Sequence, residues 1–191
     1  LAEHHGFGKV VTAFFGAVTP RTAGFNSVDN SALNMSTVLL IYFLMWVGAS
    51  PSSTGGGIKT TTFAISLMNS ISLARGKDRI EIYGREISDM TVRRAYSQIL
   101  LSLIAIGLSV FLVCNFNKDL DLRSVVFESI SAFGTVGLSL GITAKLSVAS
   151  KYVIIATMFI GRINLLTIIT AFMKQVRFSK YRYPSEDILI N

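Results

Sequence analysis

Residues 95–115 read AYSQILLSLIAIGLSVFLVCN and contain no acidic or basic residue. A helix needs about 20 apolar residues to cross a bilayer, so this stretch predicts a transmembrane helix in contact with membrane lipid. The composition agrees, because 51% of the 191 residues are hydrophobic, 15% are charged, and the mean hydropathy is +0.55. We therefore predict an all-α membrane protein. A disordered chain and a disulfide-stapled secreted module are excluded.

Two more zones are nearly free of charge. Residues 149–173 predict a second span, with Arg162 near its centre. Between Asp29 and Arg75 the one charged residue is Lys59, and this zone is too long for a single crossing. Its apolar parts, 38–48 and 63–73, flank the segment ASPSSTGGGIKTTT (49–62). We expect one discontinuous span whose non-helical loop lines a cavity, since irregular backbone at membrane depth must be covered by protein or water.

Two apolar segments, 10–20 and 124–133, are too short to cross and predict half-helices that enter the membrane and return. Basic residues gather in 75–94 and 174–182. The positive-inside rule places both clusters on the cytoplasmic face, so both half-helices enter from outside a multi-pass protein of the cell membrane. Since this placement accounts for the net charge of +7, the charge does not indicate nucleic acid as a partner.

The half-helices end in similar sequences: Thr22-Ala23-Gly24-Phe25-Asn26 and Thr135-Val136-Gly137-Leu138-Ser139, 113 residues apart. The same offset aligns Gly48 with Gly161. Parallel repeats are related by an axis along the membrane normal, as around a central pore. Glycine permits positive φ, so each T-x-G segment can turn backbone carbonyls toward a dehydrated cation. The alternative is a pair of ordinary glycine turns between helices.

Two basic residues, Lys59 and Arg162, lie well inside the apolar zones, away from their ends. A central arginine costs about 2.5 to 3.5 kcal/mol to insert, so Arg162 is expected to face a pore or loop carbonyls. A structural hydrogen bond between helices is the alternative for Arg162. Lys59 either belongs to the loop or lies solvated at its cytoplasmic edge.

The chain resembles the Trk/Ktr/HKT superfamily of potassium transporters, and within it the KtrB branch of membrane subunits. The resemblance is carried by VTPRTAGFNSVD (18–29), STGGGIKTTTF (53–63), ESISAFGTVGLSLG (128–141), FIGR (159–162) and YPSEDILI (183–190). It implies tandem span/pore-loop/span repeats, potassium-channel-like, with a broken helix. Residues 1–94 would be the third repeat without its first span, and 95–191 the fourth repeat with a cytoplasmic tail. The remaining N-terminal half of the same protein would complete the ring.

The resemblance also implies residue roles. A filter for K+ would be formed by Thr22, Ala23, Gly24, Phe25, Thr135, Val136, Gly137 and Leu138. A gate would be formed by Ser53, Thr54, Gly55, Gly56, Gly57, Lys59 and Arg162. It further implies a homodimer, a cytosolic nucleotide-binding ring (KtrA-like) docked on 75–94 and the tail, and Na+ as a coupled or regulatory ion. The chain departs from the family at Ala49 and Ser52, where glycine is common, and at Asn164-Leu165, where Gly-Pro is common.

Two other motif matches give little support for a different function. Residues 137–141 match G-x-S-x-G, but the two histidines, His4 and His5, precede the serine, which argues against an esterase-like enzyme. Residues 57–60 lack the G-K pair of a phosphate-binding loop. The sequence thus predicts a potassium uptake pore. A secondary carrier with an unwound substrate-binding helix is the alternative, and a non-conducting scaffold is the third possibility.

Overall fold

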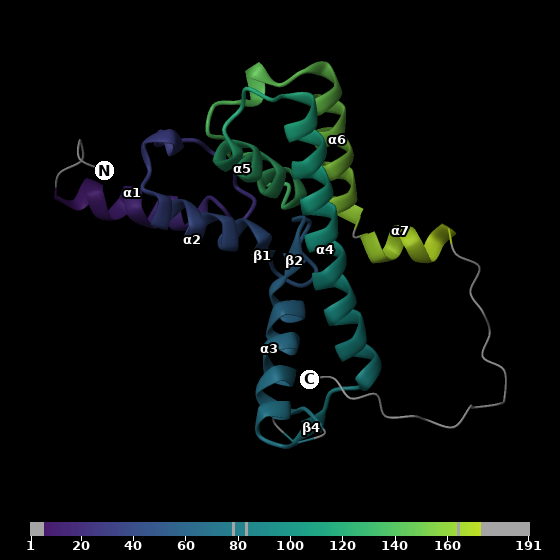
Figure 1. Cartoon of the computed structure of the whole chain (residues 1–191). Coiled ribbons are helices and arrows are strands. Elements are labelled where there is room, and N and C mark those ends of the chain that lie inside the picture. Colours follow the sequence, from purple (N-terminus) through teal and green to yellow (C-terminus); the bar gives the residue numbers. More distant parts are fainter. Residues whose placement is uncertain (1–5, 78, 83, 164, 173–191) are drawn as a thin grey trace.

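The computed structural model describes residues 6–77, 79–82, 84–163 and 165–172, and it is mostly helical (Figure 1). Its helices are α1 (Phe7–Val18), α2 (Met35–Trp46), α3 (Thr60–Ala74), α4 (Asp89–Phe116), α5 (Leu122–Phe133), α6 (Val148–Ile163) and α7 (Leu165–Phe172). Short 3-10 helices, η1 (Asn30–Ala32) and η2 (Thr143–Lys145), precede α2 and α6. His4, His5, the basic residues of 174–182 and the segment 183–190 lie outside the described residues.

Helix α4 is the long central helix, and it confirms the helix predicted over 95–115. Within the described ranges it is the one helix both long and apolar enough to cross a bilayer. Helices α3, α5 and α6 all pack along it. The short helices predicted over 10–20 and 124–133 are present as α1 and α5, each beginning two or three residues earlier than expected.

Small polar side chains join α4, α5 and α6. The Thr157 hydroxyl donates to Ser109 Oγ at 3.0 Å, and Ser109 Oγ donates to Ser129 Oγ at 3.3 Å. All three residues are buried. Such residues allow close helix approach in an apolar setting while satisfying each other's hydrogen bonds. The three helices therefore form one packed unit.

The span predicted over 149–173 is not a single helix. Helix α6 ends at Ile163 and α7 begins at Leu165, and Figure 1 shows α7 turned across the direction of α6. α7 packs against both α4 and α6. The bend after Arg162 thus forms without the Gly-Pro pair that is common in the resembling family.

Two small strand pairs depart from the all-α expectation. β1 (Val47–Ala49) and β2 (Ile58–Lys59) pair in parallel between α2 and α3, and β3 (Glu81–Ile82) and β4 (Arg85–Glu86) form an antiparallel turn between α3 and α4. Both pairs give backbone amides and carbonyls partners where no helix supplies them. The non-helical segment ends at Lys59 rather than at Thr62, because the three threonines begin α3.

Helices α2 and α3 do not share an axis. Figure 1 shows α2 lying across the direction of α3 and α4. Val38, Ile41 and Met45 bury one face of α2 against α5 and the segment after it, with Phe127, Val136 and Leu138 as partners. Helix α3 packs instead against α4. Different partners thus orient the two helices differently. That they cross a membrane as one discontinuous span stays a prediction.

Corresponding elements recur at the 113-residue offset. η1 and η2 span equivalent positions, and α2 and α6 begin at equivalent positions, Met35 and Val148. Thr22 and Gly24 have φ of 67° and 72°, and Thr135 and Gly137 have φ of 53° and 92°. The order of half-helix, left-handed turn, 3-10 helix and helix is therefore the same in both parts of the chain.

Gly161 should not tolerate a side chain. A Cβ there would lie 1.9 Å from the Phe133 carbonyl oxygen, because α6 touches the end of α5 backbone to backbone. We expect Gly161→Ala to lower the free energy of unfolding by about 3 kcal/mol, near the upper end for overpacking. Gly107→Ala on α4, where a Cβ meets nothing within 4 Å, is the control and should stabilise by about 0.5 to 1 kcal/mol. Thermal unfolding in detergent measures both, and equal midpoints would contradict the close packing.

Candidate functional site

The two T-x-G segments, which we call the first tip (22–26) and the second tip (135–139), touch each other. A Cβ on Gly24 would lie 2.0 Å from the Val136 carbonyl oxygen. A Cβ on Gly137 would meet nothing closer than Gly24 Cα, at 3.9 Å. The glycines predicted to lie beside one path are thus adjacent, and at Gly24 only a glycine fits.

Both tips have the same alternation of backbone handedness. Thr22 and Gly24 have positive φ and Ala23 between them does not, and the same holds for Thr135, Val136 and Gly137. Alternation of this kind permits successive carbonyls to lie on one side of a strand and successive amides on the other. Positive φ at the two threonines was not foreseen from the sequence, because threonine rarely adopts it.

The tip amides point back toward the half-helices. Ala23 and Gly24 both donate to the Thr19 carbonyl at 3.2 Å, and the Thr19 hydroxyl donates to the Phe25 carbonyl at 3.1 Å. In the second tip, Thr135 donates to the Ala132 carbonyl at 3.0 Å and Val136 to the Ser131 carbonyl at 2.9 Å. Each tip is therefore fastened to the C-terminal end of its own helix, which is the negative end of the helix dipole.

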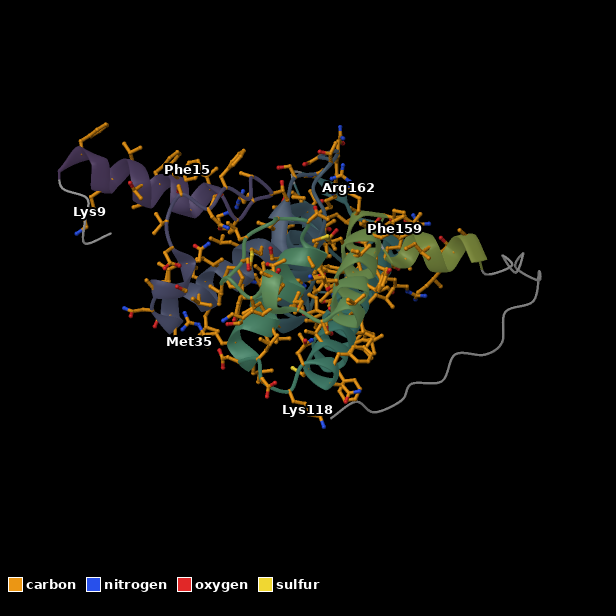
Figure 2. All side chains as sticks on the ribbon, turned by 90° about the horizontal axis from the view of Figure 1, so that it is seen from above. Lys9, Phe15, Met35, Lys118, Phe159 and Arg162 are labelled. Atoms are coloured by element: carbon orange, nitrogen blue, oxygen red, sulfur yellow. The ribbon has the colours of Figure 1, made fainter. Side chains whose placement is uncertain are left out.

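The side chains of the two tips differ in environment. Val136 and Leu138 are buried in the core formed with α2. Phe25 is 69% exposed, and none of the described residues of α1 is buried. Figure 2 shows α1, with Lys9 and Phe15 labelled, standing apart from α6, on which Phe159 and Arg162 are labelled. The second tip is packed on several sides, whereas the first tip rests mainly on the second.

The glycine-rich loop (50–57) contacts the beginning of both tips. Gly56 N donates to Thr135 Oγ1 at 2.9 Å, and a Cβ on Gly55 would lie 2.9 Å from Thr22 Cγ2. Gly57 N donates to the Gly161 carbonyl of α6 at 3.3 Å. Gly55 and Gly56 are buried, while Ser53 and Thr54 are exposed. Three consecutive glycines thus let this backbone reach the tips and α6 at once.

Lys59 is bound to the loop. Its Nζ donates to the Gly55 carbonyl at 2.7 Å and to the Ser53 carbonyl at 2.9 Å. The hypothesis that Lys59 is simply solvated is therefore wrong. Arg162 was expected to face a pore or loop carbonyls. The Ser53 and Gly55 carbonyls bind Lys59 instead, and the Arg162 side chain is exposed, so a position facing a pore stays a prediction. Arg162 remains close enough for its charge to repel that of Lys59.

A cavity of about 430 Å³ lies beyond the tips and is lined by both repeats. Its polar lining includes Asn26, Asp29, Ser139 and Thr143. Hydrogen bonds from the Ser31 hydroxyl at 2.7 Å and the Ser31 amide at 2.9 Å lower the pKa of Asp29 below its usual value. The carboxylate is thus held in the charged form that attracts cations. No group of three metal-ligating His, Cys, Asp or Glu residues occurs in the part of the chain that the structure describes.

Comparison with known proteins identifies the family. The model of the TrkH family, described as a cation transport protein, matches residues 5–181. The chain belongs to the TrkH family. It is 39% identical over 188 residues to Ktr system potassium uptake protein B of Bacillus subtilis, and 37% identical over 182 residues to the protein of that name in Vibrio alginolyticus. It is 37% identical over 187 residues to the potassium/sodium uptake protein NtpJ of Enterococcus hirae.

These alignments cover most of this chain but less than half of each relative. They include 98%, 95% and 95% of this chain, and 42%, 40% and 42% of the Bacillus, Vibrio and Enterococcus proteins respectively. The TrkH-family chain therefore spans about two fifths of the length of the curated relatives it matches. The relatives' names describe uptake proteins and not enzymes.

Proposed function

We propose that this chain forms part of a potassium uptake pore in the cell membrane, with backbone carbonyls of the two tips binding the dehydrated ion. The observation that carries the proposal is the contact between two tips of equal backbone handedness, with Gly24 against the Val136 carbonyl. A ring of carbonyls can replace the hydration shell of K+. The fastened amides of Ala23, Gly24, Thr135 and Val136 favour carbonyls directed away from the helices at these residues, whereas the Phe25 carbonyl accepts from Thr19. The names of the relatives, which include potassium uptake and potassium/sodium uptake, support K+ as the principal ion, and we propose Na+ as a coupled or regulatory ion.

Two tips do not surround an ion. We propose that the remaining half of a longer protein supplies two further tips and covers the apolar side chains of α1, of which Phe7 is 82% and Phe14 is 71% exposed. Relatives more than twice as long as this chain support that proposal. In this arrangement 1–94 and 95–191 are the third and fourth repeats.

The glycine-rich loop would be the gate. It lies against the threonines that begin both tips, so its position decides whether an ion can leave them on that side. The Lys59 ammonium, held by two carbonyls, stabilises the observed loop conformation. Arg162 adds a second positive charge nearby, and together they raise the electrostatic barrier to a passing cation.

Regulation would come from the cytoplasmic side. We propose a homodimer whose hairpin between α3 and α4 and whose tail dock a cytosolic nucleotide-binding ring of the KtrA kind. The names of relatives as Ktr system components support a multi-subunit system. The hairpin presents Arg75, Lys77 and Arg85 as exposed basic residues, and Arg93 lies exposed near the start of α4, whereas Arg79 pairs with Glu86 at 3.4 Å. The other exposed basic residues suit acidic partners.

Flux through the full-length transporter tests the pore. Reconstituted in liposomes with a K+ gradient, it should pass Rb+ or K+ down that gradient, because a carbonyl filter lets ions enter and leave its sites in succession. Saturable uptake of an organic solute would favour the secondary carrier, in which the non-helical 47–59 segment binds substrate. Absence of any alkali-ion flux would reject both the pore and its filter residues.

A further inference from the structure

We propose that Glu128 is a positioning residue that fixes the second tip in its ion-binding conformation. The inference rests on the proposed function, since it assigns a supporting residue to the same filter. Glu128 lies on α5, the half-helix behind the second tip, and its side chain is buried with 7% exposure. A buried carboxyl group is costly unless it is hydrogen-bonded, so its partners indicate why it is retained.

The partners of Glu128 lie at the outer end of the second tip. The Ser139 hydroxyl donates to Oε2 at 2.8 Å, and the Thr143 hydroxyl of η2 donates to Oε1 at 2.6 Å. The two hydroxyl oxygens are themselves 3.0 Å apart. Ser139 Oγ also accepts the amide hydrogen of Gly141 at 3.0 Å. One carboxyl group therefore ties the end of the tip and the following 3-10 helix to α5.

This tie acts on a strained segment. Thr135 and Gly137 have positive φ, and a non-glycine residue in that region costs about 1 to 3 kcal/mol unless its surroundings hold it. The inner end of the second tip is held by hydrogen bonds from its backbone amides to carbonyls of α5, and by the hydrogen bond from the loop to Thr135. Glu128 supplies the hold at the outer end, two residues beyond Gly137.

Among the described residues, the first tip has no such carboxyl group. At the 113-residue offset, Phe15 corresponds to Glu128, and Figure 2 shows Phe15 on α1. Asn26 and Asn30 correspond to Ser139 and Thr143, and they bond each other, with Asn30 Nδ2 donating to Asn26 Oδ1 at 2.8 Å. In both parts of the chain, a side-chain contact links the tip to the 3-10 helix that follows it. In the second tip this linked pair is also bound to the preceding helix, through Glu128 of α5. The two repeats contribute unequally to the filter.

Selectivity in liposomes tests the assignment. Glu128→Ala should lower the K+ to Na+ flux ratio at least about fivefold, because the outer end of the tip can then widen to accept a differently sized ion. Glu128→Gln should stay within about twofold of wild type, since the amide oxygen still accepts from Ser139 and the amide hydrogens bond the Thr143 oxygen. Ser139→Ala and Thr143→Val each remove one hydroxyl and should give intermediate losses; they also keep the test valid if Glu128→Ala fails to fold.

Asp119→Ala, which removes an exposed acidic residue between α4 and α5, is the control for charge alone and should leave the ratio unchanged. Equal ratios for wild type, Glu128→Ala and Ser139→Ala in conducting protein would overturn the role of Glu128 and leave the pore intact. A wild-type protein that passes no K+ would instead overturn the pore, and this inference with it. Loss of selectivity in Glu128→Gln as large as in Glu128→Ala would also contradict positioning by hydrogen bonds.

Discussion

Gly24→Ser is expected to reduce the K+ to Na+ flux ratio of the full-length transporter by at least about tenfold. A side chain at Gly24 would place Cβ 2.0 Å from the Val136 carbonyl oxygen, so the two tips would have to separate. The φ of 72° adds a further cost of about 1 to 2 kcal/mol for a residue with a side chain. Separated tips cannot hold their carbonyls at the distances that a dehydrated K+ requires. Flux of both ions into liposomes gives the ratio.

Gly137→Ser and Gly76→Ser separate the two causes. Gly137 has a φ of 92°, but the nearest atom to a Cβ there is 3.9 Å away. Gly137→Ser therefore adds backbone strain without a steric clash, and the K+ to Na+ flux ratio should fall less than for Gly24→Ser. Gly76, at the end of α3, has a φ of 70° and open space, and its substitution should lower stability without changing the ratio. Equal effects of Gly24→Ser and Gly137→Ser would contradict the contact between the tips as the cause. Unchanged selectivity in both would place the filter elsewhere.

The helices of the described fold were largely predictable because their signals are local. The charge-free run 95–115 gave α4, and the apolar segments bounded by Lys9 and Arg123 gave α1 and α5. Directions in space depend on packing partners that no local pattern names. α2 lies across α3 because Val38, Ile41 and Met45 pack against α5. α7 lies across α6 and packs against α4.

The positions of the glycines in the candidate site could be predicted from the sequence. The partners of its long side chains could not. Gly24 and Gly137 are marked by the repeat, and the structure brings them together. The gate roles of Lys59 and Arg162 rested on the resemblance, and for Arg162 also on its depth in an apolar zone. Neither argument says which cation reaches the loop carbonyls. Glu128 is visible in the sequence as the acidic residue within the apolar 124–133 segment, but nothing in the sequence gives it a role. Its partners Ser139 and Thr143 depend on how the chain folds back after the second tip.

Lys59→Met is expected to raise K+ flux at least about fivefold in protein reconstituted without a regulatory ring. The Lys59 ammonium makes two bonds to loop carbonyls, and hydrogen bonds of charged groups contribute about 1.5 to 3 kcal/mol each. A change of 1.4 kcal/mol shifts a conformational equilibrium about tenfold, so loss of one such bond moves the loop equilibrium toward the open conformation by about that factor. Deleting residues 52–57 removes the loop itself and should raise flux further. Initial rates of Rb+ uptake at equal protein content measure both.

The Arg162→Ala variant distinguishes the two cations. Arg162 is exposed and acts on the loop through its charge, whereas Lys59 is bonded to it, so flux should rise less for Arg162→Ala than for Lys59→Met. Lys151→Met, at the exposed beginning of α6, controls for the loss of one positive charge and should leave flux unchanged. Lys59→Arg, which can still donate to two carbonyls, should remain near wild type. Flux that does not change in Lys59→Met, or that rises equally in Lys151→Met, would mean that the bonds from Lys59 do not close the gate.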